Sequence, residues 1–252
     1  MRRPRVAVLY HFLRPDDVVS ARQLDGLCEG LAADGWEVVA HPSNRSCFAR
    51  GVSYPLRERI GDVDLRRVWR PDFPQSSGLG RLANSAWMTA SWTALTGLVD
   101  RDLDAVIVGT DPVLGAAVAP LLRRLRPRVA IAHWAFDLYP EAAIADGMLD
   151  AKSAVALSTN AIMTASYRAC DVIVDIGSCM RRRIREHGHT AREETLVPWA
   201  LSEPATRVAP DAEMRRALFG EARVGILYSG NFGKAHAYEG ALALARATRN
   251  DG

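Results

Sequence analysis

The chain has 252 residues, of which 48% are hydrophobic and 24% charged, which fits one large α/β domain, or one domain and part of another. Its 32 basic and 29 acidic side chains give a formal net charge of +3, which indicates no nucleic-acid partner but leaves room for a local anion site. The four cysteines form no C-x-x-C pair and no zinc-ligand pattern with histidine. The first apolar run begins at Arg5, without room for the core of a signal peptide. We therefore expect reduced thiols, no metal site and a cytoplasmic protein.

Apolar runs that predict strands alternate with helical patterns along most of the chain. Most of the runs are apolar throughout, as parallel strands covered on both faces should be. This alternation predicts an α/β fold with a parallel sheet, and we expect residues 42–62 and 70–80 to be surface loops. Another helix is expected to begin at Asp111, as its N-cap, with Pro112 in the first turn. The predicted strands cover 5–10, 36–41, 66–70, 104–109, 128–134, 171–177 and 194–200, and the other helices cover 18–34, 80–99, 152–169 and 178–187.

A linker separates two predicted units. Residues 201–210, LSEPATRVAP, hold two prolines and little apolar pattern, so we expect them to join a domain over 1–200 to a second unit over 211–252. In that second unit, VGILYS at 224–229 predicts a strand that runs into a glycine-rich turn and a helix. One strand and one helix cannot bury a core, so we expect this second domain to be incomplete.

The turn SGNFGKAH at 229–236 has the features of a phosphate site. Gly230 and Gly233 let the backbone approach a ligand, the helix that follows favours negative charge, and Lys234 adds a cation. It is not a Walker A motif, because Ala235 stands where a magnesium-binding Ser or Thr is needed. The alternative is a structural turn whose glycines only adopt positive φ. The first strand is followed by no G-x-G-x-x-G, which disfavours a nicotinamide dehydrogenase.

Four segments carry a resemblance to a known family: HWAFDLYPEAAIADGMLD at 133–150, CDVIVDIGSCMRRRIREHG at 170–188, LVPWA at 196–200 and LYSGNFGKAH at 227–236. Together they resemble family 4 glycosyltransferases, and most of all the branch that builds bacterial surface polysaccharides. The resemblance implies a GT-B architecture, in which two Rossmann-like domains face across a cleft. The acceptor binds mainly to the first domain and the nucleotide-sugar donor mainly to the second. The chain then holds the first domain and the first strand and helix of the second, truncated before the family's donor-binding E-x7-E motif.

The resemblance also implies an activity. It indicates a retaining glycosyltransferase that moves a sugar from a nucleotide-diphosphate donor to a hydroxyl of a glycan, lipid-linked or small-molecule acceptor. The donor is a co-substrate, and the family needs no cofactor and no bound metal. Residues of the glycine-rich turn would bind the donor phosphates: Ser229, Gly230, Asn231, Gly233, Lys234 and His236.

Asp137 and His133 are the catalytic candidates. Asp137 follows the predicted strand that ends near His133, which places it at the carboxyl end of the sheet, where open α/β folds bind ligands. The resemblance makes Asp137 the candidate for orienting or polarising the acceptor hydroxyl, and the alternative is a cap of the helix that starts at Pro140. His133 ranks lower, because a lone histidine in an apolar strand is more often a core residue. For Glu141 we expect only a favourable interaction with the helix dipole.

Partners stay open at this stage. Residues 82–99 carry no charge but are too polar to span a membrane, so we expect burial, with shallow peripheral contact at the inner face of the membrane as the alternative. The arginine-rich helix at 178–187 is expected to be a solvated face, with anionic lipid or donor phosphate as its alternative ligands. One rival function is a non-catalytic acceptor-binding or regulatory half that needs a partner chain to supply the donor half. A sugar-nucleotide epimerase is a second rival.

Overall fold

The computed structural model describes residues 2–74, 77–201, 206, 209–229 and 238–248. The chain divides into two compact units, Met1–Leu201 and Ser202–Gly252, and each is described by itself.

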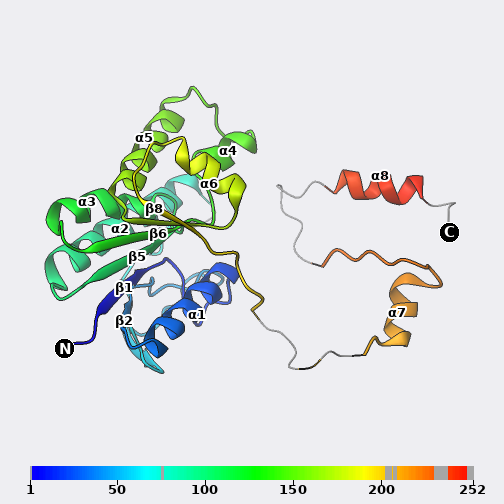
Figure 1. Cartoon of the computed structure of the whole chain (residues 1–252), viewed down its shortest axis with the longest axis horizontal. Coiled ribbons are helices and arrows are strands. Elements are labelled where there is room, and N and C mark those ends of the chain that lie inside the picture. Colours follow the sequence, from blue (N-terminus) through cyan, green and yellow to red (C-terminus); the bar gives the residue numbers. More distant parts are fainter. Residues whose placement is uncertain (1, 75–76, 202–205, 207–208, 230–237, 249–252) are drawn as a thin grey trace. The chain divides into compact units, whose positions relative to one another are not determined.

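The first unit is built on an eight-stranded sheet with the order β3-β4-β2-β1-β5-β6-β7-β8 (Figure 1). Neighbouring strands are parallel, except that β3 pairs antiparallel with β4 at one edge. The chain builds outward from β1 in one direction and then from β5 in the other, so the topological switch point lies between these two strands. The strands are β1 (Arg5–Leu9), β2 (Glu37–Ala40), β3 (Arg57–Ile60), β4 (Val63–Arg66), β5 (Ala105–Gly109), β6 (Ala130–Trp134), β7 (Val172–Asp175) and β8 (Arg192–Thr195).

Local capping explains where two of the long helices begin. The Ser77 hydroxyl accepts a hydrogen bond from the Gly80 amide at the start of α2, and Ser153 does the same for Ala156 at the start of α5. A π-helical segment, Leu95–Val99, continues α2, and a 3-10 turn, Gly115–Ala117, precedes α3. The helices are α1 (Val19–Ala33), α2 (Gly78–Ala94), α3 (Val118–Leu125), α4 (Glu141–Ala145), α5 (Ala154–Ala169), α6 (Ser178–Arg185), α7 (Ala212–Phe219) and α8 (Glu239–Ala247).

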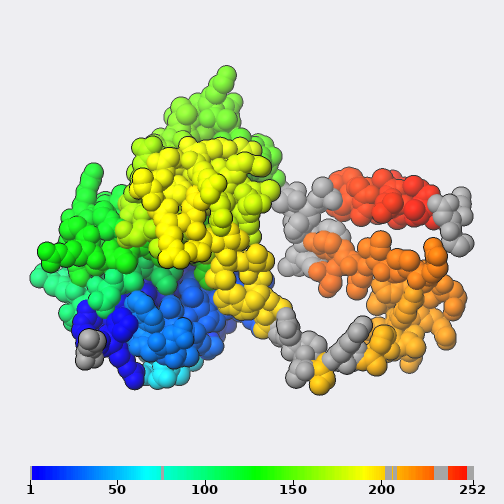
Figure 2. All heavy atoms as spheres, viewed as in Figure 1, coloured from blue at the N-terminus to red at the C-terminus, as the bar shows by residue number. Residues whose placement is uncertain are grey.

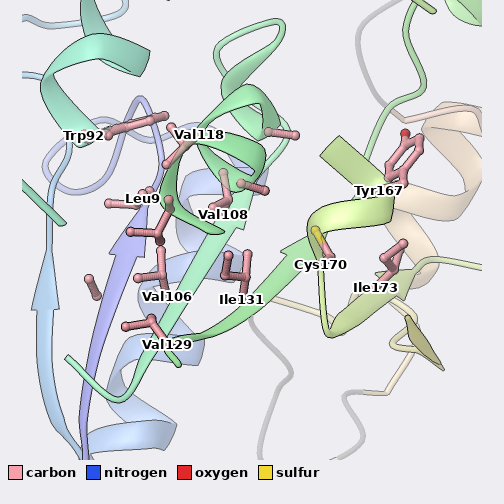
Figure 3. Packing of buried hydrophobic residues seen from close by; sticks show 14 of the residues in the cluster. Leu9, Trp92, Val106, Val108, Val118, Val129, Ile131, Tyr167, Cys170 and Ile173 are labelled. Atoms are coloured by element: carbon pink, nitrogen blue, oxygen red, sulfur yellow. The ribbon is translucent and has the colours of Figure 1, made fainter. Parts of the chain in front are cut away.

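Helices cover both faces of the sheet. Alternate residues of a strand point to opposite faces, so Ala7 and Leu9 of β1 join the core beneath α2, α3 and α5, while Val6 and Val8 pack toward α1. Figure 3 shows the first of these cores, with side chains from the sheet and from the helices above it. The Trp92 indole of α2 also donates to the His41 carbonyl, at 2.7 Å. This packing on both faces confirms the predicted α/β fold and fixes the strand ends at one edge.

The structure corrects the region between residues 42 and 70. The predicted strand at 66–70 is wrong, because β4 ends at Arg66 and Val68 makes only an isolated bridge with Ser43. Conversely, β3 forms inside the segment that was expected to be a loop. Its sequence, RERI, is mostly exposed at the edge of the sheet, where charged side chains are favoured and the apolar signal of a buried strand is missing.

The predicted helix start at Asp111 is also wrong. Leu114 adopts φ +66°, a left-handed conformation that a helix cannot contain, and α3 begins only at Val118. Asp111 is therefore not a helix cap, and its side chain takes another role, described below.

The second unit has no core within its described residues. Residues 224–229 form no strand, and Ile226 is 80% exposed, so the strand predicted there is absent. A lone strand has no neighbour to complete its hydrogen bonds. The helix expected after the turn is present as α8, but neither α7 nor α8 buries a residue. Across the described part of the chain, no helix combines the length and apolar character needed to cross a membrane.

Candidate functional site

A pocket of about 230 Å³ opens where β1, β5 and β6 end. Its walls come from the segments that follow these strands: Tyr10 after β1, Thr110 and Asp111 after β5, and Asp137 and Tyr139 after β6. The pocket thus lies at the carboxyl edge of the sheet beside the switch point, where open α/β folds bind their ligands. We call it the Asp137 pocket.

Two hydrogen bonds of the Thr110 hydroxyl, one donated and one accepted, hold the segment that carries Asp137. The Thr110 hydroxyl donates to the Trp134 carbonyl at 3.3 Å and accepts from the Phe136 amide at 2.7 Å. Asp137 does not cap α4, which follows Pro140 without any side-chain cap. Among the described residues, no hydrogen-bond donor or cation pairs with the Asp137 carboxylate. The structure therefore leaves this carboxylate available to a ligand.

The Asp137 pocket is acidic, because Asp111 and Asp137 both line it. The Asp137 side chain is exposed to solvent at the mouth of the pocket. Its partial burial, together with the negative charge of Asp111, raises the pKa of the Asp137 carboxyl above its ordinary value. The pKa of the Tyr139 phenol is raised mainly by burial, and further by the negative charges of Asp137 and Asp111. Burial and Asp111 likewise raise the pKa of Tyr10. Both phenols stay protonated at neutral pH, so the pocket offers hydroxyl groups and carboxylates to a polar ligand.

His11 and Asp111 were missed by the sequence analysis. The His11 amide donates to the Asp111 carbonyl at 3.0 Å, and the His11 ring nitrogen Nδ1 lies 3.4 Å from the Asp111 carboxylate. His11 is buried and stacks on Phe12, with the ring centroids 4.0 Å apart. A signal was present, because each residue follows one of two strands that pair in parallel, and parallel strands end at the same edge.

His133 lies in the core and not in the Asp137 pocket. Its side chain is 1% exposed and packs against Tyr167 of α5, and its ring nitrogen Nδ1 is 2.9 Å from the Val108 carbonyl. Burial lowers the pKa of His133 to about 4, so the ring is neutral at physiological pH. This placement agrees with the core alternative that the sequence analysis left open.

Glu141 has a second interaction besides the helix dipole. Its carboxylate Oε1 lies 3.3 Å from His187 Nε2, and the His187 ring in turn is 2.7 Å from the Thr164 hydroxyl. The hydrogen bond with His187 lowers the pKa of Glu141. These contacts tie α4 to α5 and to the end of α6, and they hold the segment that follows Asp137.

Of the proposed donor-phosphate residues, the described chain includes only Ser229, which is exposed. The others lie outside the described residues: Gly230, Asn231, Gly233, Lys234 and His236.

The segment LVPWA leaves β8 and returns to α1. The Gln23 amide donates to the Trp199 carbonyl at 2.7 Å, and the Trp199 ring stacks on Trp134 with centroids 5.9 Å apart. Gly26 leaves room for this ring, because a Cβ there would lie 3.2 Å from it. Figure 2 shows the segment, in yellow, beside the blue surface of α1. The end of the first unit is thus anchored next to the strand that precedes Asp137.

Comparison with known proteins identifies the family. Residues 20–200 match the model of the glycosyl transferase 4-like domain. The chain belongs to this glycosyltransferase family. No curated protein matches the sequence of this family member. The match confirms the predicted family 4 membership, whereas the surface-polysaccharide branch stays a prediction.

Solved glycosyltransferase structures share the fold of this family 4 domain. Sucrose-phosphate synthase from Thermosynechococcus elongatus aligns with a TM-score of 0.56 at 13% identity, over 78% of this chain and 48% of that one. TcCGT1 in complex with UDP aligns with a TM-score of 0.51 at 9% identity, over 84% of this chain and 54% of that one. The family 4 chain thus spans about half the length of these proteins. At such identities the likeness shows the GT-B-type fold alone.

The interaction between the two carboxylates of the Asp137 pocket gives a first prediction. Asp111→Asn removes a negative neighbour, so ionised Asp137 becomes more stable and its pKa should fall, while the partial burial of Asp137 still raises the pKa to a smaller extent. Carbon-13 NMR titration of the Asp137 carboxyl measures this shift. Asp102→Asn, at an exposed position outside the pocket, is the control and should have no effect. An unchanged Asp137 pKa in Asp111→Asn would show that the two carboxylates do not interact.

Proposed function

We propose that the protein transfers a sugar from a nucleotide-diphosphate donor to an acceptor hydroxyl, with retention of configuration, and that the Asp137 pocket holds the acceptor. The main support is an accessible carboxylate with no partner among the described residues, at the carboxyl edge of a family 4 glycosyltransferase domain. Glycosyl transfer depends on positioning and on stabilising developing charge, so it needs few protein groups. Sugars present hydroxyl donors, which an ionised carboxylate accepts.

The pKa of Asp137 defines its chemical role. A carboxylate is far too weak a base to remove the proton of a free sugar hydroxyl, even when its pKa is raised. It can, however, accept a hydrogen bond from that hydroxyl and point the oxygen lone pair at the anomeric carbon. As the new C–O bond forms and the bond to the diphosphate breaks, the hydroxyl becomes acidic and its proton passes to an oxygen of the departing diphosphate, which gains negative charge in the same step. Asp137 therefore orients and polarises the acceptor.

The donor diphosphate is assigned to the turn at 229–236. Its glycines, its lysine and the start of the following helix all favour a phosphate group. TcCGT1, which shares the fold, is described in complex with UDP, which supports a nucleoside-diphosphate donor. We propose no cofactor and no metal for this transfer.

A second candidate function is an acceptor-binding or regulatory half that works with a partner chain. The absence of buried residues in α7 and α8 favours it, because the second unit then needs other surfaces to complete a core. Two measurements separate the candidates: the intact mass of the protein from its source, against 27.6 kDa for this chain, and turnover of nucleotide sugars by the chain alone. Turnover without a partner rules out the binding-only candidate.

Asp137→Asn should reduce the rate of transfer about 100-fold, within the range for loss of a positioned acid–base group, and leave donor binding unchanged. The amide keeps the shape of the side chain but offers a weaker acceptor to the sugar hydroxyl. Rates are measured with the enzyme as its source makes it, and Asp146→Asn at the exposed end of α4 is the matched control. Full activity of Asp137→Asn contradicts the acceptor role.

Lys234→Ala should weaken nucleoside-diphosphate binding about tenfold, which corresponds to about 1.4 kcal/mol. The loss follows from removing a positive charge that would offset the charge of the bound phosphates. Titration calorimetry with UDP and other nucleoside diphosphates measures it, and Arg246→Ala in the exposed helix α8 tests for a general effect of charge. If both variants bind like the unaltered protein, the turn is not the phosphate site.

We also propose a cytoplasmic location with peripheral contact at the inner membrane face. Residues 82–99 and 153–167 carry no charge, and a groove of about 310 Å³ lies between α2, α3 and α5, with Leu82, Leu121 and Ile162 in its walls. Arg124, one turn from Leu121, is exposed and has no acidic partner in the described chain. An apolar face edged by arginine suits an anionic bilayer. A symmetric dimer through this face would bring the two copies of Arg124 together.

Leu82→Glu should lower the fraction of protein that floats with vesicles containing phosphatidylglycerol at least threefold, because it places a negative charge in the apolar face. Leu56→Glu, at a similarly exposed position outside the groove, should float like the unaltered protein. Equal flotation of the two variants, or a dimer that Leu82→Glu dissociates, contradicts membrane contact through this face.

A further inference from the structure

Arg70 is a buried cation without a counter-ion. Its side chain is 1% exposed, yet none of the described carboxylates lies within 4.0 Å of its guanidinium. Its Nε donates to the Ser43 hydroxyl and its Nη1 to the Pro71 carbonyl, both at 3.1 Å. Arg67 is similarly buried, at 6% exposure, but pairs with Glu58 at 2.8 Å. Because a buried charge is costly unless it is paired, Arg70 lacks an anion that its neighbour Arg67 has.

The Arg70 side chain lines a pocket of about 210 Å³, which we call the Arg70 pocket. Arg50 lines it too, and the Arg45 guanidinium lies nearby, donating from Nε to the Arg70 carbonyl at 3.2 Å. One carboxylate, Asp72, is in the wall, 3.7 Å from Arg50, and also accepts the Gly51 amide. Burial lowers the pKa of Arg70. The negative charge of Asp72 raises it, and the nearby positive charge of Arg45 lowers it further. Three arginines against Asp72 in the wall and the more distant Asp111 leave this pocket positive.

The loop that carries Arg45 and Arg50 is held in place. The buried Asp16 carboxylate accepts hydrogen bonds from the Ser46 hydroxyl at 3.1 Å, the Cys47 amide at 3.2 Å and the Tyr54 hydroxyl at 2.9 Å. These donors satisfy Asp16, so it does not neutralise the arginines through a direct contact. The Arg70 pocket is consequently preformed, which lowers the entropy cost of binding.

The Arg70 pocket adjoins the Asp137 pocket. Cys47 lines both of them. Asp111 interacts electrostatically with Asp137 on one side and with Arg70 on the other. A molecule that fills the Asp137 pocket therefore has a positive pocket within reach, past Cys47.

We propose that the Arg70 pocket binds an anionic group of the acceptor, a phosphate or a carboxylate, while a hydroxyl of the same molecule lies at Asp137. The inference rests on the proposed glycosyl transfer and names its acceptor class: a sugar that carries a negative charge. The planar guanidinium matches both anions, since each presents two oxygens to its parallel N–H groups. Asp72 occupies the Arg50 side of the pocket, so the anion sits on the Arg70 side.

Binding of inorganic phosphate to the 252-residue chain, without any donor, tests the site first. Titration is followed by the Nε–H NMR signals of nitrogen-15-labelled arginine. The Arg70 signal should shift, and Arg70→Gln should weaken phosphate binding at least tenfold. Arg45→Gln removes the positive charge beside Arg70. It should weaken phosphate binding about threefold, and it is the safeguard in case Arg70→Gln does not fold. Arg59→Gln, on the exposed edge strand β3, is the matched control. Unchanged phosphate affinity in Arg45→Gln, or in a folded Arg70→Gln, overturns the site.

Sugars then identify the anion and separate this inference from the proposed function. The affinities for glucose 6-phosphate and for glucuronate are each compared with the affinity for glucose. Tighter binding of glucose 6-phosphate assigns a phosphate to the site, and tighter binding of glucuronate assigns a carboxylate. Equal affinity for all three overturns the inference. If the charged sugar binds but the complete enzyme transfers nothing to it or to any other acceptor, the proposed function fails and the anion site stands. If transfer occurs and Arg45→Gln leaves KM and kcat unchanged, the anion site fails and the function stands.

Discussion

The parallel pairing of β1 with β5 is the constraint on which the site depends. In this register Val8 lies beside Ile107 and Leu9 beside Val108, so both strands end at the same level. The His11 amide continues the ladder by one more hydrogen bond, to the Asp111 carbonyl at 3.0 Å. Pairing of β5 with β6 then brings the segment of Asp137 to the same edge. A slip of one residue in either pair would turn these side chains to the opposite faces of the sheet.

Charge is distributed unevenly along this edge. Asp111 and Asp137 make one pocket acidic, and Arg45, Arg50 and Arg70 make the adjoining one basic. Within the described chain, no direct ion pair neutralises Asp137 in the acidic pocket or Arg70 in the basic one. Leaving a buried charge such as Arg70 unpaired costs stability, and such costs are concentrated at functional sites, where a ligand supplies the missing partner. A polar molecule with hydroxyls at one end and an anion at the other satisfies both pockets.

The sequence predicted the parallel core and the position of Asp137, and it missed what depends on the tertiary structure. The central strands are apolar throughout because helices cover both faces of the sheet, so a short stretch of sequence is enough to predict them. Strand β3 lies at the edge of the sheet, and its polar sequence gives no such signal. Asp111 followed by proline resembles a helix start, but the left-handed Leu114 delays the helix. Arg70 gave no signal, because a run of sequence does not show which arginine the fold buries without a carboxylate.

The most direct measurement is a structure of the protein with a charged sugar, such as glucose 6-phosphate, bound. We expect a sugar hydroxyl within hydrogen-bond distance of the Asp137 carboxylate and the anionic group against the Arg70 guanidinium. Such a complex would show that the edge formed by β1, β5 and β6 is the acceptor site of this glycosyltransferase family member. A sugar bound elsewhere, with both pockets empty, would contradict that assignment.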